Sequence, residues 1–227
     1  MKVSIIVPAY NEEGTIGPVL DRLVALDLDC EIIVVNDGST DGTAQVLAAF
    51  RNERVTVENK PNGGKGTALR RGFELAHGDV VVVQDSDLEL DPNNIPNLIA
   101  PIERGEADVV YGSRFLQKVE GLKLNRRAAN WLLTTLTNTV YRTRITDMET
   151  AHKAMKRELL EHLDLQSTKF DIEVELTAKL ARSGARIVEI ASPYQPRSVD
   201  QGKKIRFSDG LHALRMILKW SRWRPTA

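Results

Sequence analysis

Residues 80–92 read VVVVQDSDLELDP, so four consecutive valines lead directly into acidic side chains at Asp85, Asp87, Glu89 and Asp91. A short run of β-branched residues is typical of a strand buried on both faces, as in a parallel sheet. Side chains that follow such a strand emerge at the sheet edge where open α/β proteins bind their ligands. The stretch therefore predicts a fold class and a location for function.

The spacing of the carboxylates indicates a metal site. Asp85, Asp87 and Glu89 share one face if the chain stays extended after the strand. Adjacent carboxylates on that face would lie about 6–7 Å apart and repel by roughly 2–3 kcal/mol at an effective dielectric of 20. A divalent cation removes this cost, and oxygen ligands without nearby His or Cys favour Mg²⁺ or Mn²⁺. We predict that Asp85, Asp87 and Glu89 bind the metal, whereas Asp91 and Pro92 form a turn that caps the next helix.

The rest of the chain alternates between strand and helix patterns in its first half. Strands are predicted at Val3–Val7, Glu31–Val35, Val55–Glu58, Val80–Gln84 and Asp108–Tyr111, and helices at Thr15–Leu26, Gly42–Arg51, Thr67–Ala76 and Asn94–Glu103. The second half adds helices at Asn125–Arg142, Phe170–Ser183 and Phe207–Trp223, and strands at Ala151–Met155 and Ile187–Ile190. This order predicts an α/β fold with a mostly parallel central sheet and helices on both faces.

Composition excludes several classes of protein. The chain has 31 Lys and Arg against 31 Asp and Glu, which gives no reason to expect nucleic-acid binding. No window approaches 18 consecutive apolar residues, and no signal peptide is visible. Cys30 is the only cysteine and is expected to be a buried small side chain, which suits a reducing compartment. We therefore expect a cytoplasmic protein.

Two more polar segments follow strands. PAYNEE (residues 8–13) follows the first strand and NDGSTDG (36–42) follows the second, so both should reach the same sheet edge as the carboxylates. Asp37 at the end of a strand is typical of a nucleotide contact, and Asp41 of a helix cap. The first of these turns lacks G-x-G-x-x-G, which argues against a NAD-type site. It also lacks Arg and Lys, which argues against a nucleotidyltransferase.

NGGKGTALRRG (residues 62–72) places Lys65 among glycines at a predicted helix start. Such a position suits a bound phosphate, although a plain glycine turn explains it as well. The segment is not a P-loop, because Asn59 stands where that motif has its first glycine.

Together these segments resemble family 2 glycosyltransferases of the GT-A fold, with QDSDLELDP matching the family's D-x-D metal motif. YGSRF, NRR, TDMET and PYQPRSVDQGKKI resemble the branch of dolichyl-phosphate mannose synthase and bacterial polyprenyl-phosphate sugar transferases. The resemblance runs from about Ser4 to Trp220. It implies a single GT-A domain over residues 1–227, in which residues 1–114 bind the nucleotide-sugar and residues 115–227 the acceptor.

The resemblance also assigns roles to residues. It implies that the base and ribose of a UDP- or GDP-sugar contact Pro8, Tyr10, Glu12 and Asp37. It implies that the phosphates of donor and acceptor face Arg114, Arg126 or Arg127, Arg197 and Lys203. Asp147 and Glu149 would lie near the sugar. We therefore expect Asp87, Arg114, Asp147 and Glu149 to be catalytic, and Lys65 and Asp85 to help bind the donor.

The expected reaction transfers a hexose with inversion to a polyprenyl phosphate, and the alternative acceptor is a sugar hydroxyl of a growing glycan. An ionised lipid phosphate needs no general base, whereas a hydroxyl does. Asp147 is the first candidate for that base and Glu149 the second. The structural alternative for Asp147 is a helix cap or a buried partner of Arg142 or Arg144.

The C-terminal helix carries apolar residues interspersed with Arg and Lys. It can pack on the domain, or it can lie at a membrane surface. Contact with the cytoplasmic membrane face or with a membrane protein is therefore a second expectation. The basic residues of 197–206 are predicted to form a loop that closes over phosphate.

Overall fold

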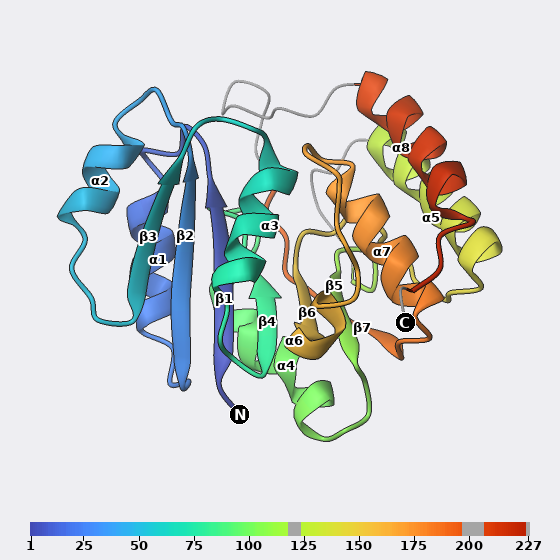
Figure 1. Cartoon of the computed structure of the whole chain (residues 1–227), viewed down its shortest axis with the longest axis horizontal. Coiled ribbons are helices and arrows are strands. Elements are labelled where there is room, and N and C mark those ends of the chain that lie inside the picture. Colours follow the sequence, from blue (N-terminus) through green and yellow to red (C-terminus); the bar gives the residue numbers. More distant parts are fainter. Residues whose placement is uncertain (118–123, 197–206, 226–227) are drawn as a thin grey trace.

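A seven-stranded sheet, in the order β3-β2-β1-β4-β6-β5-β7, runs through the computed structural model (Figure 1). The structure describes residues 1–117, 124–196 and 207–225, without the side chains of residues 125, 126 and 207–211. The strands are β1 (Val3–Ala9), β2 (Cys30–Asp37), β3 (Val55–Lys60), β4 (Val80–Val83), β5 (Val109–Ser113), β6 (Lys153–Lys156) and β7 (Ile187–Ala191). The helices are α1 (Ile16–Val24), α2 (Thr43–Ala49), α3 (Lys65–Leu75), α4 (Ile95–Glu103), α5 (Leu124–Tyr141), α6 (Arg157–Leu160), α7 (Ile172–Arg182) and α8 (Phe207–Trp220).

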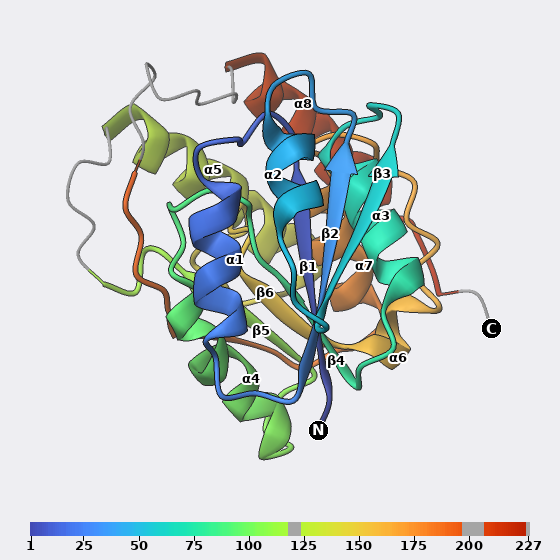
Figure 2. The same cartoon turned by 90° about the vertical axis from the view of Figure 1, so that its left-hand side faces the viewer.

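Apolar clusters cover both faces of the sheet, because successive residues of a buried strand point to opposite sides. Ile5 of β1 joins the cluster formed with α1, α2 and α4, and Ile6 joins the cluster formed with α3, α5, α7 and α8. Figure 2 shows α1 and α4 on one side of the sheet and α3 and α7 on the other. All four valines of β4 are buried, as the opening stretch predicts for a strand covered on both faces.

β6 is the only strand among the described residues that runs against its neighbours. It pairs antiparallel with β4 and with β5, whereas the other neighbouring strands are parallel. The beginning of β6 therefore lies at the edge where the parallel strands end. Lys153 is in register with Val83 at the end of β4 and with Tyr111 of β5. This reversal brings the segment before β6 to the same edge as the carboxylates.

The predicted fold class is confirmed, and the predicted elements are present with ends displaced by a few residues. α3 begins at Lys65 and not at Thr67, and α8 ends at Trp220 and not at Trp223. Asp91 caps the short 3-10 turn Pro92–Asn94 as predicted, since its side chain accepts a hydrogen bond from the backbone N of Asn93. In the part of the chain that the structure describes, no helix is both long enough and apolar enough to cross a bilayer.

Candidate active site at the carboxyl edge of the sheet

The loops after β1 and β2 are tied together by side-chain hydrogen bonds. Asn11 has a φ of 54°, a left-handed conformation that Asn adopts more readily than most residues. Its Oδ1 accepts a hydrogen bond from the backbone N of Thr40 at 2.8 Å. The backbone N of Asn11 donates to Ser39 Oγ at 3.0 Å, and that of Glu12 donates to Thr43 Oγ1 at 2.8 Å. The two predicted polar segments therefore form one surface.

Three residues of the first loop were predicted to contact the base and ribose of a nucleotide-sugar. Pro8 is buried at the end of β1, and Tyr10 is 36% exposed. The carboxylate of Glu12 accepts a hydrogen bond from Thr15 Oγ1 at 2.7 Å. The structure brings these residues to the expected edge, and their contact with a nucleotide stays a prediction.

Asp37 joins the end of β2 to the glycine loop before α3. Asp37 is buried, and its carboxylate is paired with Lys60 and accepts hydrogen bonds from the backbone N of Gly63 at 3.0 Å and of Gly64 at 2.7 Å. In this structure Asp37 therefore fixes the start of α3, where Lys65 is the first residue. The predicted nucleotide contact of Asp37 is not tested by these bonds.

A chain of buried charges leads from Lys65 into the interior. Lys65 Nζ lies 2.7 Å from Asp85 Oδ1 and 3.2 Å from Glu173 Oε1. Burial alone would lower the pKa of Lys65, but Asp85 and Glu173 raise it well above its ordinary value. Glu173 also pairs with Lys153, which is fully buried. Asp85 is thus paired with Lys65, and Lys65 is in turn paired with the buried Glu173.

The rest of the acidic loop is fixed by contacts with the segment after β7. Glu89 Oε2 accepts a hydrogen bond from the Tyr194 hydroxyl at 2.9 Å, and Glu89 O accepts one from the backbone N of Gln195 at 2.9 Å. Asp87 Oδ1 accepts one from the backbone N of Glu89 at 3.0 Å. Gln84, fully buried, donates to the carbonyls of Asp85 and Leu90, both at 3.2 Å. These bonds hold the loop as a compact turn.

The predicted metal ligands are near one another in sequence but have different neighbours. Asp85 is paired with Lys65, and Glu89 with Tyr194. Across residues 1–117, 124–196 and 207–225, no three His, Cys, Asp or Glu side chains are grouped as a ready metal site. Asp85 and Asp87 remain suitable for Mg²⁺ or Mn²⁺, because such ions often take one or two carboxylates together with substrate phosphates.

Arg114 and Asp147 form a second buried ion pair at this edge. Arg114 Nε and Nη2 each lie 2.7 Å from an Asp147 oxygen, and the Arg114 backbone N donates to Oδ2 at 3.0 Å. Asp147 is completely buried, and its backbone N donates to Glu189 Oε1 at 3.1 Å. The structural alternative, in which Asp147 is a buried partner of an arginine, is therefore correct in kind. The arginine is Arg114 and not Arg142 or Arg144. The predicted role of Asp147 in catalysis stays a prediction.

The guanidinium of Arg114 lies near two aromatic rings. Its Cζ is 5.2 Å from the centre of the Tyr194 ring and 5.7 Å from that of Phe115. Burial alone would lower the pKa of Arg114, but the charge of Asp147 raises it above its usual value. Arg114 is thus a permanent cation in a fixed orientation, which suits the recognition of phosphate.

Glu149 has the carboxylate most suited to accept a proton. Burial, together with the nearby charge of Glu173, raises the pKa of Glu149 to about 7, against the opposing effect of Lys153 and Arg114. One of its oxygens, Oε1, is buried without a hydrogen-bond partner among the described residues. A carboxylate with a pKa near neutrality can act as a general base at physiological pH.

The remaining predicted phosphate contacts are less well placed by the structure. Arg127 is exposed on the first turn of α5. The side chain of Arg126 and the residues Arg197 and Lys203 lie outside the described residues.

Sequence reasoning missed Lys153, Glu173 and Tyr194. Glu173 stands in the first turn of α7, where acidic residues commonly stabilise a helix end, so nothing marked it as unusual. Lys153 carried a weak signal, because a Lys in a strand between buried neighbours requires a buried partner.

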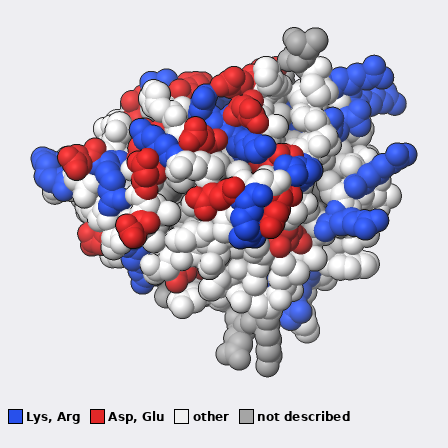
Figure 3. All heavy atoms as spheres, turned by 90° about the horizontal axis from the view of Figure 1, so that it is seen from below, with Lys and Arg blue, Asp and Glu red and all other residues white. Residues whose placement is uncertain are grey.

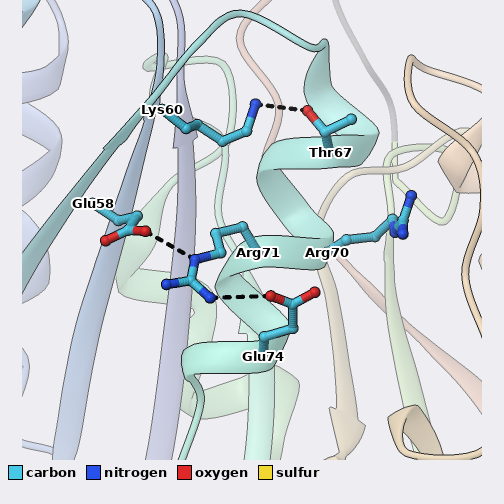
Figure 4. Close-up of a pocket in the computed structure, with 6 residues that line it drawn as sticks. All are labelled: Glu58, Lys60, Thr67, Arg70, Arg71 and Glu74. Carbon is cyan, nitrogen blue, oxygen red and sulfur yellow. Dashed lines mark hydrogen bonds and ion pairs between the residues drawn. The ribbon is translucent and has the colours of Figure 1, made fainter.

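One cavity lies away from these carboxylates. It has a volume of about 270 Å³ between β3 and α3 and is lined by Glu58, Lys60, Thr67, Arg70, Arg71 and Glu74. Figure 4 shows Arg71 between Glu58 and Glu74, with Arg70 pointing away from them. None of the predicted site residues lines it, and its own charges are largely paired, so the candidate site is the carboxyl edge.

Comparison with known proteins identifies the family. The profile of "Glycosyl transferase family 2" matches residues 4–164. The chain is 31% identical to the dolichol-phosphate mannosyltransferase of Pyrococcus furiosus, over 98% of this chain and 64% of that protein. It is 29% identical to the undecaprenyl-phosphate mannosyltransferase of Micrococcus luteus, over 98% of this chain and 96% of that protein. Against other curated relatives the chain spans about half of their length, 53% and 51% in two cases.

A solved structure shares the fold. The glucosyl-3-phosphoglycerate synthase of Mycobacterium tuberculosis, in complex with Mn²⁺, UDP-glucose and phosphoglyceric acid, superposes with a TM-score of 0.73 at 26% identity. The match covers 97% of this chain and 79% of that one. The fold is therefore of the GT-A type, as the sequence predicted.

Proposed function

This chain belongs to glycosyl transferase family 2, and from that membership we propose that it transfers a hexose from a UDP- or GDP-sugar to a polyprenyl phosphate. In the reaction, an acceptor oxygen forms a bond to the anomeric carbon while the bond from that carbon to the nucleotide diphosphate breaks. One displacement of this kind inverts the configuration at the anomeric carbon. The products are a sugar-linked lipid phosphate and a nucleoside diphosphate.

The observation that carries the proposal is the position of Asp85 and Asp87. Both lie directly after buried β4, beside the joined loops of β1 and β2, at the edge where α/β sheets bind nucleotides. The choice of acceptor is supported by two relatives whose names specify transfer to polyprenyl phosphates and which align with nearly the whole of this chain. The choice of donor class is supported by a neighbour bound to UDP-glucose.

The three carboxylates of the acidic loop are chemically suited to bind a divalent cation. Asp85 and Asp87 would hold Mg²⁺ or Mn²⁺, with Glu89 as a further oxygen ligand, and each offers a hard carboxylate. The cation would neutralise charge on the leaving diphosphate as a Lewis acid. A neighbour of the same fold contains Mn²⁺.

The protein's own cations have two further tasks in this proposal. Arg114 is held by Asp147 in one orientation, so it meets a phosphate without first losing rotational freedom. Lys65 is paired with Asp85, and if Asp85 held a metal ion the Lys65 ammonium would be available to bind the donor phosphates. Asp147 acts here by positioning Arg114, since both of its oxygens are already bonded.

The nature of the acceptor decides whether a base is needed. A polyprenyl phosphate is ionised at neutral pH and attacks without one. A second candidate function, transfer to a sugar hydroxyl, is favoured by one observation, the neutral-range pKa of Glu149. In that case Glu149 accepts the hydroxyl proton, which reverses the order of preference between Asp147 and Glu149 that the sequence suggested.

We further propose that the reaction takes place in the cytoplasm, because the single cysteine, Cys30, is buried and unpaired.

The test is product formation from a panel of UDP- and GDP-sugars with Mg²⁺ or Mn²⁺, with and without a short polyprenyl phosphate. Sugar transfer that requires the lipid supports the proposal and identifies the donor. Metal-dependent hydrolysis of the donor that the lipid does not change, together with transfer to a glycan hydroxyl, would replace it with the second function.

A further inference from the structure

We propose that the exposed faces of α5 and α8 dock on a bilayer surface that carries anionic lipids. We call this surface the α5–α8 face. Its apolar members are Leu124, Trp131 and Leu132 of α5 and Leu218 of α8, and its cations are Arg127, Arg142, Arg144, Arg215, Lys219, Arg222 and Arg224. Docking would bring the site to a polyprenyl acceptor in the bilayer, and that role rests on the proposed function. The docking itself does not depend on the proposed function.

α5 places apolar side chains on its outer side as well as on its inner side, where Leu133 and Tyr141 are buried. Its buried side includes Asn130, Thr134 and Thr137. Its exposed side carries Leu124, Trp131 and Leu132, which are 81%, 68% and 59% exposed. A helix on the surface of a soluble protein normally turns its apolar side inward. Large apolar side chains gathered on an outer face are typical of an interaction site.

α8 follows the usual distribution on its inner side and adds charge on its outer side. Met216, Ile217 and Trp220 are buried, which confirms that the helix packs on the domain. Its outer side exposes Leu218 together with Arg215, Lys219 and, just after the helix, Arg222. The two expectations for this helix are therefore compatible, because packing uses one side and leaves the other to solvent.

The two helices lie side by side, so their outer faces are continuous. The Tyr141 hydroxyl at the end of α5 donates a hydrogen bond to the carbonyl of Ile217 in α8. Leu133 of α5 and Met216 of α8 belong to the same buried cluster. Figure 1 shows both helices at the end of the molecule farthest from α2, with their first turns toward the edge at which β1 and β2 end. A surface docked there would lie next to the candidate active site.

The charge of this face differs from that of the chain as a whole. Residues 124–146 and 210–227 contain no Asp or Glu, although the chain has 31 acidic residues. In the described part of the chain, no carboxylate pairs with Arg215, Arg222 or Arg224. Figure 3 shows Lys and Arg without neighbouring acidic residues at this end, whereas the two signs are mixed over the rest of the view. Cations interspersed with Trp and Leu fit an anionic lipid surface.

The same charges argue against a second copy of the chain as the occupant. A symmetric dimer through this face would bring each set of cations against its own copy, and like charges disfavour that contact. A lipid surface meets both the apolar and the cationic members without this repulsion.

The experiment measures binding of the full chain to vesicles by co-sedimentation. The vesicles are made of phosphatidylcholine with or without phosphatidylglycerol, and neither kind contains polyprenyl phosphate. We expect binding to the anionic vesicles that weakens as salt is raised. Trp131→Ser with Leu132→Ser, and separately Arg215→Gln with Arg222→Gln, should each weaken binding about tenfold. The matched control is Arg51→Gln with Arg104→Gln, which removes two exposed cations elsewhere and should bind like the original chain.

All of these side chains are exposed, so unchanged thermal unfolding is the check that each variant folds. Equal binding to neutral and anionic vesicles, or equal losses in the Arg51 and Arg104 control, would overturn the proposal. So would sedimentation equilibrium that shows a dimer in the original chain and a monomer in the Trp131 variant, without vesicle binding. The docking and the proposed function can fail separately. Vesicle binding without sugar transfer would contradict only the function. Transfer to a soluble short polyprenyl phosphate without vesicle binding would contradict only the docking.

Discussion

Arg114 and Asp147 are joined by two parallel hydrogen bonds of 2.7 Å inside the protein, with the Asp147 side chain fully buried. A carboxylate bonded through both oxygens has little capacity left to accept a proton from a substrate. The pair therefore positions Arg114. This arrangement leads to the first prediction.

Asp147→Asn should lower transfer by at least about tenfold for a lipid phosphate and for a hydroxyl acceptor alike, because Arg114 loses its fixed orientation. The variant should also lose about 3 kcal/mol of stability, since a buried cation is left without its partner. Initial rates with both acceptors and urea unfolding measure these effects.

The matched control for that variant is Asp108→Asn. Asp108 pairs with Arg186 through two bonds of 2.9 Å at the opposite edge of the sheet, so its loss should affect stability and leave the rate unchanged. A much larger loss with the hydroxyl acceptor than with the phosphate would show that Asp147 is the base.

Glu149→Gln should change stability in a pH-dependent way. Folding raises the pKa of Glu149 from 4.5 to about 7, so the folded chain binds this proton more tightly than the unfolded chain. The stability of the original protein then falls as pH rises from about 4.5 through about 7. Gln does not ionise, so the variant should be more stable at pH 8 by on the order of 1–3 kcal/mol and equal near pH 4. Urea midpoints at the two pH values test this.

Activity of the same variant separates the two acceptor classes. With a lipid phosphate the Gln variant should keep most of its rate. With a hydroxyl acceptor it should lose the rise in rate through pH 7 that a general base produces. A stability gain of the same size at both pH values would mean that the effect is packing and not ionisation.

Lys65→Gln should tighten binding of Mn²⁺ in the absence of nucleotide by about tenfold, because the ammonium 2.7 Å from Asp85 no longer competes with the ion. Transfer should nevertheless fall, since a cation near the donor phosphates is lost. Calorimetric titration with Mn²⁺ and steady-state rates give the two results. Lys60→Gln is the control, because Lys60 pairs with Asp37 and should leave Mn²⁺ affinity unchanged. Weaker Mn²⁺ binding in the Lys65 variant would exclude this competition.

Gly66→Ala should destabilise the protein by about 1–3 kcal/mol, because a Cβ at this position would lie 2.4 Å from the backbone oxygen of Ser167. Relief requires α3 to move away from the loop at 167–168, which also displaces Lys65. Gly14→Ala is the control, since its Cβ would meet nothing within 4 Å. Thermal unfolding of the two variants tests the difference, and equal melting temperatures would disprove the close approach.

Local sequence was sufficient for the strands and for the position of the loops that follow them, but the acidic loop is a compact turn and not the extended segment on which the metal prediction was based. Four consecutive valines are typical of a buried strand, and the position of Asp85 after that strand follows from the order of the chain. Asp91 could be assigned as a cap because a cap involves only the next few residues.

Local sequence was insufficient for pairings across long separations. Arg114 and Asp147 are 33 residues apart, and several arginines were equally plausible partners. Lys153 and Glu173 meet because the antiparallel direction of β6 puts its first residue, Lys153, near the first turn of α7. Nothing in the four residues of β6 reveals that direction.

The order of strands has a consequence for how the molecule folds. β5 precedes the boundary at residue 114, yet its partners in the sheet are β6 and β7, which come after that boundary. A fragment of residues 1–114 would thus contain a strand with no neighbour to pair with, and β4 would keep only β1 beside it. Residues 1–114 and 115–227 are interleaved in the sheet, so the sheet is completed only when residues from both parts have joined it.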